Sequence, residues 1–366
     1  MSRTSEDELA ERLRAATHRC TQVLWNRQQT PAETFQALAA ACRELGIEDW
    51  DAYGERGAVA RLEAEVAGLL GRDAAAYFPS GVMAQQVALR IHTERAGSSR
   101  VAIPDLSHLL VHEEDGPRIL HRLVVEHLTR GRVTATREHL DAICGRLAAV
   151  LVELPLRDAG CLLPTYHELA DLAVACRERG VALHLDGARI WESQPWFGRE
   201  LPEIAALAGT LYVSFYKGLG GLAGAALLGE EETIAEARTW RRRMGGTIYR
   251  STAEAVSALV GLRDRLPLMP DIVAWARRLA AALPDDITPQ PEVPQTNTFL
   301  LYAAGEATAV NERLATFMEQ YGVGIGRPWS ATEVPGRIVT ELAVGEGALE
   351  LDPETVAAQI GGLLSP

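Results

Sequence analysis

The 366-residue chain is 47% hydrophobic and 23% charged, a composition that predicts a soluble globular protein with a full-sized core. Acidic side chains (49) outnumber basic ones (36) and give a net charge of −13, which argues against a nucleic-acid partner. Five cysteines without CxxC or Cys/His spacing argue against disulfides and against a zinc site, so we expect no bound metal.

The N-terminus carries charges of both signs and lacks the apolar core of a signal peptide. No stretch approaches the ~18 consecutive apolar residues that a membrane helix requires. We therefore expect a cytoplasmic protein that makes no contact with a membrane.

Residues 1–50 are expected to form one or two helices, and residues 60–71 (ARLEAEVAGLLG) show helical periodicity that ends at a glycine. Between residues 74 and 216, apolar strands such as AAAYF, RVAIP, AAVLVEL, VALHL and TLYVSFY mostly alternate with helices. This alternation predicts a mostly parallel sheet, with the functional loops at the carboxyl ends of its strands. The later arginine run RRR (241–243) is expected to be a solvated helix face.

The composition changes near residues 283–295, LPDDITPQPEVPQ, which read as a proline-rich linker. We expect an N-terminal helical segment (1–50), a large α/β domain (51–283) and a small C-terminal α+β domain (284–366). The predicted fold class is α/β, with a mostly parallel central sheet that has helices on both faces.

Two segments carry the strongest chemical signal. The strand VALHL is followed by Asp186, and the strand TLYVSFY is followed by Lys217 and a glycine-rich stretch. Enzymes that use pyridoxal 5′-phosphate (PLP) need an aspartate that keeps the pyridine nitrogen protonated and a lysine that forms an imine with the aldehyde. The spacing of this pair therefore predicts an aspartate-aminotransferase-like PLP fold. A loop-capping aspartate and a snorkelling lysine are the alternative interpretations.

A phosphate site is predicted where Ser80, Gly81 and Val82 begin a helix directly after a strand. The free N–H groups of Gly81, Val82 and Met83 and the helix dipole favour an anion there. A serine N-cap without a ligand is the alternative. Ser214, three residues before the lysine, is placed to hydrogen-bond the same phosphate.

Two further side chains are candidates for contacts with cofactor and substrate. Arg189 would pair with a substrate α-carboxylate through its planar fork, with a surface salt bridge as the alternative. His108 follows a strand, so its ring would stack on the cofactor and move protons, although a structural histidine is the simpler interpretation.

The chain resembles the threonine aldolase family, which belongs to the β-eliminating lyase group of fold-type I PLP enzymes, from about Asp51 to its C-terminus. The most specific match is HLDGARIW against the family's HLDGARLW, together with KGLGG against SKGLGAP. The supporting matches are DAYGERGAVARLEAEVAGLLG, FPSGVMAQQ, DLSHLLVHEEDG and RIVTELAV.

The resemblance implies a role for each matching residue. It assigns Ser80 and Gly81 to the phosphate, His108 to the ring, Asp186 to the ring nitrogen, Arg189 and Arg337 to the substrate carboxylate, and Lys217 to the imine. Enzymes of this fold usually complete each site with residues of a second subunit. The resemblance therefore implies a homodimer or homotetramer, in which Tyr53 reaches the substrate of a neighbouring site.

The chain departs from the family in segments near the expected site. Val23, in VLWNRQQT, stands where the family's SDTVTRPT has a serine, and ELPLR (153–157) replaces ENTHN. Tyr249 stands at the arginine of GGGMRQ, and no histidine occupies the place near the substrate hydroxyl. Trp196 and Phe197 are added beside the DGAR turn, either as pocket residues or as a surface pair. These changes suggest a retained cofactor site with a remodelled, more apolar side-chain pocket.

The resemblance implies a carbon–carbon lyase of amino-acid metabolism, acting on a small-molecule β-hydroxy-α-amino acid to give an aldehyde and glycine or another small amino acid. Other PLP reactions at Cα and Cβ, namely β-elimination, transaldol exchange and transamination, need the same cofactor residues and remain alternatives. The last alternative is a non-catalytic protein with this fold.

Overall fold

The computed structural model describes residues 5–27 and 29–365, which fall into two units. The larger unit spans residues 29–267, and the smaller one combines residues 5–27 with 268–365. These boundaries differ from the expected ones at residues 50 and 283. Residues 269–282 form α13 (Met269–Ala282), which packs on α15 (Pro353–Leu364) in the smaller unit. The N-terminal residues join the same unit, because β1 (Gln22–Val23) pairs with β11 (Val323–Gly324).

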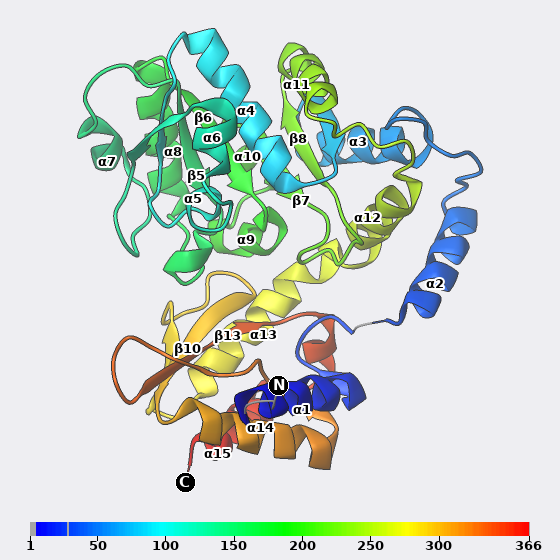
Figure 1. Ribbon diagram of the computed structural model, residues 1–366, viewed down its shortest axis with the longest axis vertical. Coiled ribbons are helices and arrows are strands. Elements are labelled where there is room, and N and C mark those ends of the chain that lie inside the picture. Colours follow the sequence, from blue (N-terminus) through cyan, green and yellow to red (C-terminus); the bar gives the residue numbers. More distant parts are fainter. Residues whose placement is uncertain (1–4, 28, 366) are drawn as a thin grey trace. The chain divides into compact units, whose positions relative to one another are not determined.

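A seven-stranded sheet forms the centre of the larger unit (Figure 1). Its strands are β2 (Ala74–Phe78), β3 (Arg100–Ile103), β4 (Val124–His127), β5 (Ala149–Glu153), β6 (Ala182–Gly187), β7 (Thr210–Ser214) and β8 (Ala225–Gly229). They lie in the order β2-β8-β7-β6-β5-β3-β4, and every neighbouring pair is parallel except the two that include β8. The predicted mostly parallel sheet is confirmed.

The central strands are largely apolar because both faces of the sheet are covered. All residues of β5 and β7 are buried, as is typical of parallel strands with helices on both faces. Acidic and hydroxyl side chains appear where these strands end. Glu153 ends β5, Asp186 is the penultimate residue of β6, and Ser214 ends β7. The sheet therefore brings three polar side chains to one edge.

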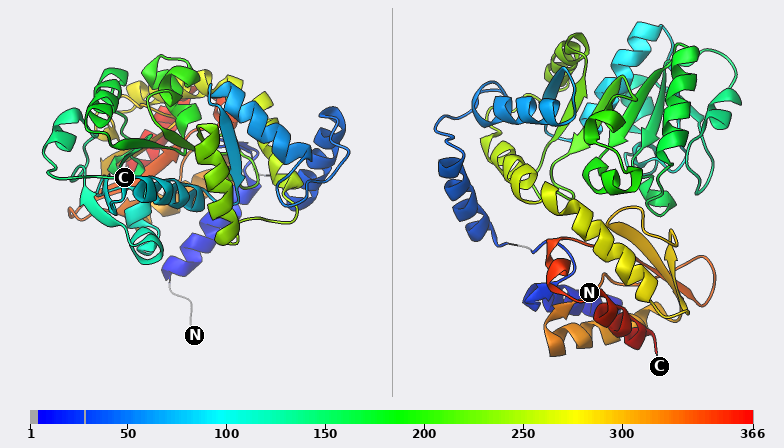
Figure 2. Two further views of the ribbon diagram at one scale, coloured as in Figure 1. Left: turned by 90° about the horizontal axis from the view of Figure 1, so that it is seen from above. Right: turned by 180° about the vertical axis from the view of Figure 1, so that it is seen from behind.

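Helices lie on both sides of this sheet (Figures 1 and 2). Helix α4 begins after the N-cap Ser80 and ends at Gly97, which adopts a left-handed φ of 58°. It packs on β7 and β8 and shares a core cluster with Phe78, Tyr212 and Leu227. The helices of this unit are α2 (Pro31–Glu44), α3 (Gly57–Leu69), α4 (Gly81–Ala96), α5 (His108–Val111), α6 (Gly116–His121), α7 (Arg137–Asp141), α8 (Tyr166–Glu178), α9 (Ile190–Phe197), α10 (Leu201–Ala205), α11 (Glu231–Arg243) and α12 (Thr252–Asp264).

The smaller unit is an α+β domain, as expected for the C-terminal part of the chain. Its antiparallel sheet has the order β12-β13-β10-β9, with β9 (Ile287–Gln290), β10 (Thr298–Ala304), β12 (Ser330–Ala331) and β13 (Arg337–Ala343). Helix α1 (Ser5–Arg19) packs along α14 (Ala307–Tyr321), and the Arg12 guanidinium lies 2.6 Å from the Glu319 carboxylate. Within the described parts of both units, no helix has the length and apolar character needed to cross a bilayer.

Candidate active site

A cavity lies at the carboxyl ends of β5, β6 and β7 in the larger unit. Because parallel strands end at one edge of a sheet, residues far apart in the sequence meet there. The cavity brings together the predicted residues Lys217, Asp186, Arg189, His108 and Val82. Its lining consists of Val82, Gln85, His108, Glu153, Pro155, Arg157, Asp186, Ala188, Arg189, Tyr212, Tyr216 and Lys217.

The Asp186 carboxyl is buried, and its Oδ1 accepts a hydrogen bond from the Ala188 N–H at 2.9 Å. Burial raises the pKa of Asp186, while the Lys217 ammonium, the Ala188 N–H and the Gln85 side chain act in the opposite direction. A cation placed against this carboxyl would offset the free-energy cost of burying its charge. Asp186 is therefore suited to pair with a protonated ring nitrogen.

Glu153 is a second buried carboxyl, directly opposite Asp186 in the register of β5 and β6. Its Oε2 accepts the His108 N–H at 2.9 Å, and its Oε1 accepts the Arg157 N–H at 3.3 Å. Burial, followed by the Asp186 charge, raises the pKa of Glu153 to about 8. Burial therefore favours the neutral form of Glu153, whose two oxygens hold two loop segments at the cavity.

The His108 ring is partly exposed at the cavity, and its Nδ1 lies 2.9 Å from Glu113 Oε1. Burial, followed by the charges of Lys217 and His112, lowers the pKa of His108 to about 4, so the imidazole is neutral at pH 7. If Nδ1–H donates to the Glu113 carboxylate, Nε2 carries the lone pair, an assignment that follows from the hydrogen bond. This tautomer is suited to accept a proton.

Lys217 is the only lysine of the chain, and all other residues in the Lys+Arg count are arginines. Burial lowers the pKa of Lys217, while the Asp186 charge raises it. A lowered pKa increases the fraction of neutral amine, which is the form that attacks an aldehyde. An arginine, which stays protonated, has no such form. The one lysine of the chain therefore stands at a position where an arginine could not form an imine. Sequence reasoning missed this signal.

Arg189 lies at the cavity beside a buried acidic neighbour, Glu192. Its Nη1 lies 3.8 Å from Glu192 Oε1, and its buried Nε has no hydrogen-bond partner among residues 5–27 and 29–365. Burial raises the pKa of Glu192, with the Arg189 charge acting against it. A Cβ on Gly218 would come within 2.2 Å of Glu192 Oε1, so this glycine makes room for the carboxyl. Sequence reasoning missed the contribution of Glu192.

The N-terminus of α4 lies at the same cavity, because Val82 of its first turn lines it. Ser80 Oγ accepts the Met83 N–H at 3.2 Å, so Gly81 and Val82 supply the remaining N–H groups of the predicted anion site. A Cβ on Gly81 would lie 2.0 Å from the Tyr212 hydroxyl oxygen, which explains the glycine at this position. Ser80 itself is exposed and acts as the helix cap.

Ser214 is fully buried at the end of β7, and its hydroxyl oxygen has no hydrogen-bond partner among residues 5–27 and 29–365. Tyr212, Ser214 and Tyr216 alternate along one strand and its extension, so they share one face. Since both tyrosines line the cavity, Ser214 is on the cavity side of the sheet. The period of two in TLYVSFYK was the available signal for the tyrosines, which sequence reasoning did not single out.

The chemistry of these groups fits PLP. A buried carboxyl suits a cationic ring nitrogen, a primary amine with a lowered pKa suits an aldehyde, and a helix N-terminus with a nearby hydroxyl suits a phosphate. The space kept by Gly81 and the unsatisfied Arg189 Nε support the same fit. In the described parts of the chain, no cluster of three or more His, Cys, Asp or Glu side chains is arranged to hold a metal ion.

Two predicted substrate residues lie elsewhere. Tyr53 is 56% exposed and packs edge-on against Tyr249, with ring centroids 5.2 Å apart. It does not line the cavity of its own chain, so its predicted role depends on a second subunit and stays a prediction. Arg337 is the exposed first residue of β13 in the smaller unit, and its contact with a substrate carboxylate also stays a prediction.

The added aromatic pair does not line the cavity. Trp196 donates its Nε1–H to the Pro164 carbonyl at 3.0 Å, and Phe197 is buried at the end of α9. The expected remodelling instead involves the segment after β5, from which Pro155 and Arg157 line the cavity. The wall is therefore not simply more apolar, because it contains an additional guanidinium.

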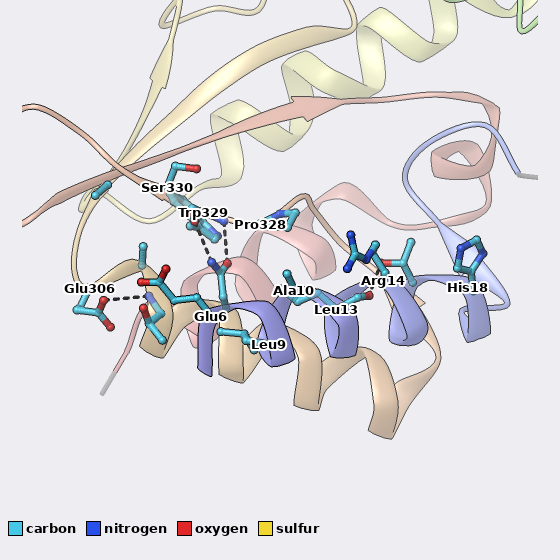
Figure 3. Close-up of a pocket in the computed structure, with 15 residues that line it drawn as sticks. Glu6, Leu9, Ala10, Leu13, Arg14, His18, Glu306, Pro328, Trp329 and Ser330 are labelled. Carbon is cyan, nitrogen blue, oxygen red and sulfur yellow. Dashed lines mark hydrogen bonds between the residues drawn. The ribbon is translucent and has the colours of Figure 1, made fainter. Parts of the chain in front are cut away.

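A second hollow lies in the smaller unit between α1, the start of α14 and residues 328–331 (Figure 3). Asn311 fixes one of its walls: its Nδ2 donates to the Trp329 carbonyl at 2.8 Å, and its Oδ1 accepts the Trp329 N–H at 2.7 Å. Glu6 and Glu306 give one end of the hollow an acidic character. None of the predicted site residues lines it.

Comparison with known proteins identifies similar chains. Residues 30–306 match the family described as Beta-eliminating lyase. The chain is similar to the solved structure of a provisionally assigned L-allo-threonine aldolase from Listeria monocytogenes EGD-E, with 31% identity, a TM-score of 0.90 and coverage of 97% of this chain and 99% of that one.

A second solved structure, from Exiguobacterium sp. 255-15, is provisionally assigned as an aromatic amino acid β-eliminating lyase or threonine aldolase. It is 35% identical, with a TM-score of 0.89 and coverage of 96% of this chain and 99% of that one. The low specificity L-threonine aldolase of Escherichia coli O157:H7 is 28% identical over 335 residues, which cover 88% of this chain and 95% of that protein.

Proposed function

Because the chain belongs to the β-eliminating lyase family, we propose that it is a PLP-dependent aldolase that splits a β-hydroxy-α-amino acid into an aldehyde and glycine or another small amino acid. The names of its relatives support this substrate class. The observation in this chain that carries the proposal is the position of its only lysine, Lys217, in one cavity with Asp186 and His108.

When bound, PLP supplies an electron-withdrawing ring that takes up the electron pair of a bond broken at the substrate Cα. Asp186 would keep the ring nitrogen protonated, and Lys217 would hold the aldehyde carbon. The N–H groups of Gly81 and Val82, together with the Ser214 hydroxyl, would bind the phosphate.

The remaining cavity residues act on the substrate. Arg189 binds the α-carboxylate through its planar fork, and this contact fixes which bond at Cα is aligned for cleavage. His108, neutral at pH 7, takes the proton of the β-hydroxyl as the carbonyl of the aldehyde forms. Arg337 is proposed as a second ligand of the carboxylate on the resemblance of RIVTELAV alone.

A lysine-mapping experiment tests the cofactor site. Reduction of the PLP-loaded protein with borohydride, followed by peptide mass spectrometry, should find the cofactor mass on the peptide that contains Lys217. The variant Lys217→Arg keeps a positive charge but lacks a neutral amine, so it should neither bind the cofactor covalently nor cleave substrate. A Lys217→Arg variant that retained cleavage would disprove the assignment.

The products formed from L-threonine and L-allo-threonine test the reaction. Equal amounts of glycine and acetaldehyde support aldol cleavage. Ammonia with a keto acid would instead select β-elimination, and an amino-group transfer product would select transamination. Binding of PLP without turnover of any β-hydroxy amino acid would favour a non-catalytic role.

We also propose a homo-oligomer located in the cytoplasm. The Tyr53–Tyr249 surface supports a subunit contact because it is aromatic and exposed. None of the cysteines in the described parts of the chain is in a disulfide, as is usual in a reducing compartment. Light scattering that gives a monomer mass would disprove the first proposal, and cell fractionation tests the second.

A further inference from the structure

Tyr212 lines the cavity from β7, beside the carboxyl that is assigned to the cofactor ring. It lies opposite Asp186 in the register of β6 and β7, just as Asp186 lies opposite Glu153 in the register of β5 and β6. The three residues form a row across the sheet and line the same cavity. The Tyr212 ring is buried against α4, in a core cluster with Ala84 and Val87. Its orientation is therefore fixed by packing, and so is the position of its hydroxyl.

The Tyr212 hydroxyl lies against the first turn of α4. A Cβ on Gly81 would overlap both the hydroxyl oxygen and the Cζ atom of this tyrosine. A glycine here lets the backbone of the turn approach the hydroxyl closely. The first N–H groups of a helix have no partner inside it, and those of Gly81 and Val82 remain after Ser80 caps the Met83 N–H. The hydroxyl thus lies beside the N–H groups that favour an anion.

The sheet, rather than the turn, brings the buried hydroxyls to this place. Gly81 and Val82 carry no polar side-chain group, and Ser80 Oγ serves as the helix cap. Ser214 lies two residues beyond Tyr212 on the same face of β7, and its hydroxyl oxygen has no hydrogen-bond partner in the described parts of the chain. Ser214 therefore does not accept the Tyr212 proton, which leaves that proton for a ligand.

The Tyr212 hydroxyl is a hydrogen-bond donor at neutral pH. Burial, followed by the Asp186 charge, raises the pKa of Tyr212 well above its usual value. A phenol that keeps its proton can donate to an anion, and such a bond is stronger than one between neutral groups. Two cations of the same cavity, Lys217 and Arg189, are already assigned to the aldehyde and to the substrate carboxylate. A neutral donor binds a phosphate without drawing on either of them.

We propose that the Tyr212 hydroxyl donates a hydrogen bond to the phosphate of the cofactor and makes the site selective for the phosphorylated aldehyde. The alternative is that Tyr212 only fills the space between β7 and α4. The first role requires the hydroxyl oxygen, whereas the ring alone suffices for the second, so removal of the oxygen distinguishes them. The inference rests on the cofactor site that the proposed function uses.

Binding of PLP and of pyridoxal, which lacks the phosphate, measures the contribution of the hydroxyl. Both aldehydes form an imine with Lys217, so the absorbance of that imine reports the binding of either one to the protein freed of cofactor. Tyr212→Phe keeps the ring and removes the oxygen. It should weaken PLP binding about 10- to 100-fold, the range expected for a hydrogen bond to a charged group, and leave pyridoxal binding unchanged. The exposed Tyr321→Phe removes the same group from α14 and should change neither.

Phosphorus NMR of the PLP-loaded protein gives a second readout, because the chemical shift reports the surroundings of the phosphate. The shift should differ between Tyr212→Phe and wild type, and Tyr321→Phe should keep the wild-type value. Equal weakening of PLP and pyridoxal would assign Tyr212 to the cofactor ring or to the fold and overturn the inference. Unchanged affinities with an unchanged phosphorus signal would leave only the space-filling role and also overturn it.

Failure of the proposed function gives a different result. Tyr212-dependent binding of PLP without cleavage of any β-hydroxy amino acid would keep the phosphate inference and refute the aldolase reaction. Cleavage of threonine by a Tyr212→Phe variant that binds PLP as tightly as wild type would keep the reaction and refute the inference. With both intact, Tyr212→Phe should need about 10- to 100-fold more PLP for half-maximal cleavage of threonine.

Discussion

Glu153 and Asp186 lie opposite each other at the carboxyl ends of β5 and β6, and both carboxyls are buried. Ionisation of both buried carboxyls would cost much free energy, so the charge on one of them raises the pKa of the other. Asp186 has Lys217 nearby to stabilise its charge, whereas Glu153 accepts backbone N–H groups of two loops. The pair therefore divides into an anion for the cofactor and a neutral acid that positions the cavity wall.

The raised pKa of Glu153 gives the folded state a pH dependence. Since its pKa rises from 4.5 to about 8, folding stability is present at low pH and is lost as the pH increases through this interval. One such group contributes a slope of up to about 1.4 kcal/mol per pH unit. Glu153→Gln should therefore flatten the dependence of Tm on pH between 5 and 8. Thermal unfolding without cofactor measures this, and an unchanged slope would contradict the raised pKa.

Two glycines offer a matched comparison of close packing. The Cβ of an alanine at position 81 would lie 2.0 Å from the Tyr212 hydroxyl oxygen. The Cβ of an alanine at position 68, in α3, would have no neighbouring atom within 4 Å. Gly81→Ala should displace the start of α4 and weaken PLP binding at least about 10-fold, by removing phosphate contacts. Gly68→Ala should leave binding unchanged and stabilise α3 by up to about 1 kcal/mol. Fluorescence titration with PLP measures the affinity of each variant. Equal affinities would show that the start of α4 does not bind the phosphate.

The arrangement of Asp186, Lys217 and Ser214 at one sheet edge was predictable from the sequence. Each follows or ends an apolar strand, and parallel strands end together. In contrast, β8 was not predicted. Its short sequence AALLG follows a glycine-rich stretch, and no turn motif marks it as the second strand of a hairpin with β7. Its antiparallel direction depends on pairing with β2 and β7, which no local pattern specifies.

The contacts that tune the site depend on tertiary packing. Arg241, expected on a solvated helix face, is instead buried and donates to the Tyr77 carbonyl. In the sequence, Glu153 stands out only as part of ELPLR, a segment that differs from the family. The burial that raises its pKa cannot be read from the sequence pattern. The single lysine, however, was a sequence signal of high value.

The Glu113 carboxylate positions the His108 ring through a contact of 2.9 Å at Nδ1. Glu113→Gln keeps the shape but permits the amide to present either its oxygen or its NH₂ group to the imidazole, so both ring tautomers become populated. The variant should lower kcat several-fold with little change in KM. His108→Ala should cost more, on the order of 10²–10⁴-fold in kcat, as is typical for loss of a general base.

Steady-state kinetics over pH tests this role. A positioning residue should alter kcat and leave the amount of bound PLP unchanged, whereas a residue that only stabilises the fold should lower both in proportion. If Glu113→Gln reduced kcat as much as His108→Ala, Glu113 would be part of the proton transfer itself.

A buried cluster in the larger unit predicts loss of stability in acid. Thr210 Oγ1 lies 2.8 Å from His92 Nε2 and 2.9 Å from His184 Nδ1. Burial lowers the pKa of His92 to about 4 and that of His184 to about 3, from 6.5. Below pH 6.5 the unfolded chain therefore binds protons that the folded chain does not. Stability present above pH 6.5 is lost as the pH falls toward 4.

Substitution of one histidine of this cluster should weaken the acid dependence. Each buried histidine contributes a slope of up to about 1.4 kcal/mol per pH unit in this range, so His92→Gln should make the fall of Tm between pH 6.5 and 4 shallower. Its Tm at pH 7 will also be lower, because the Thr210 hydroxyl loses a partner. The exposed His167→Gln serves as the control and should follow the wild-type curve. Parallel curves for His92→Gln and wild type would show that His92 is not held neutral in the folded chain.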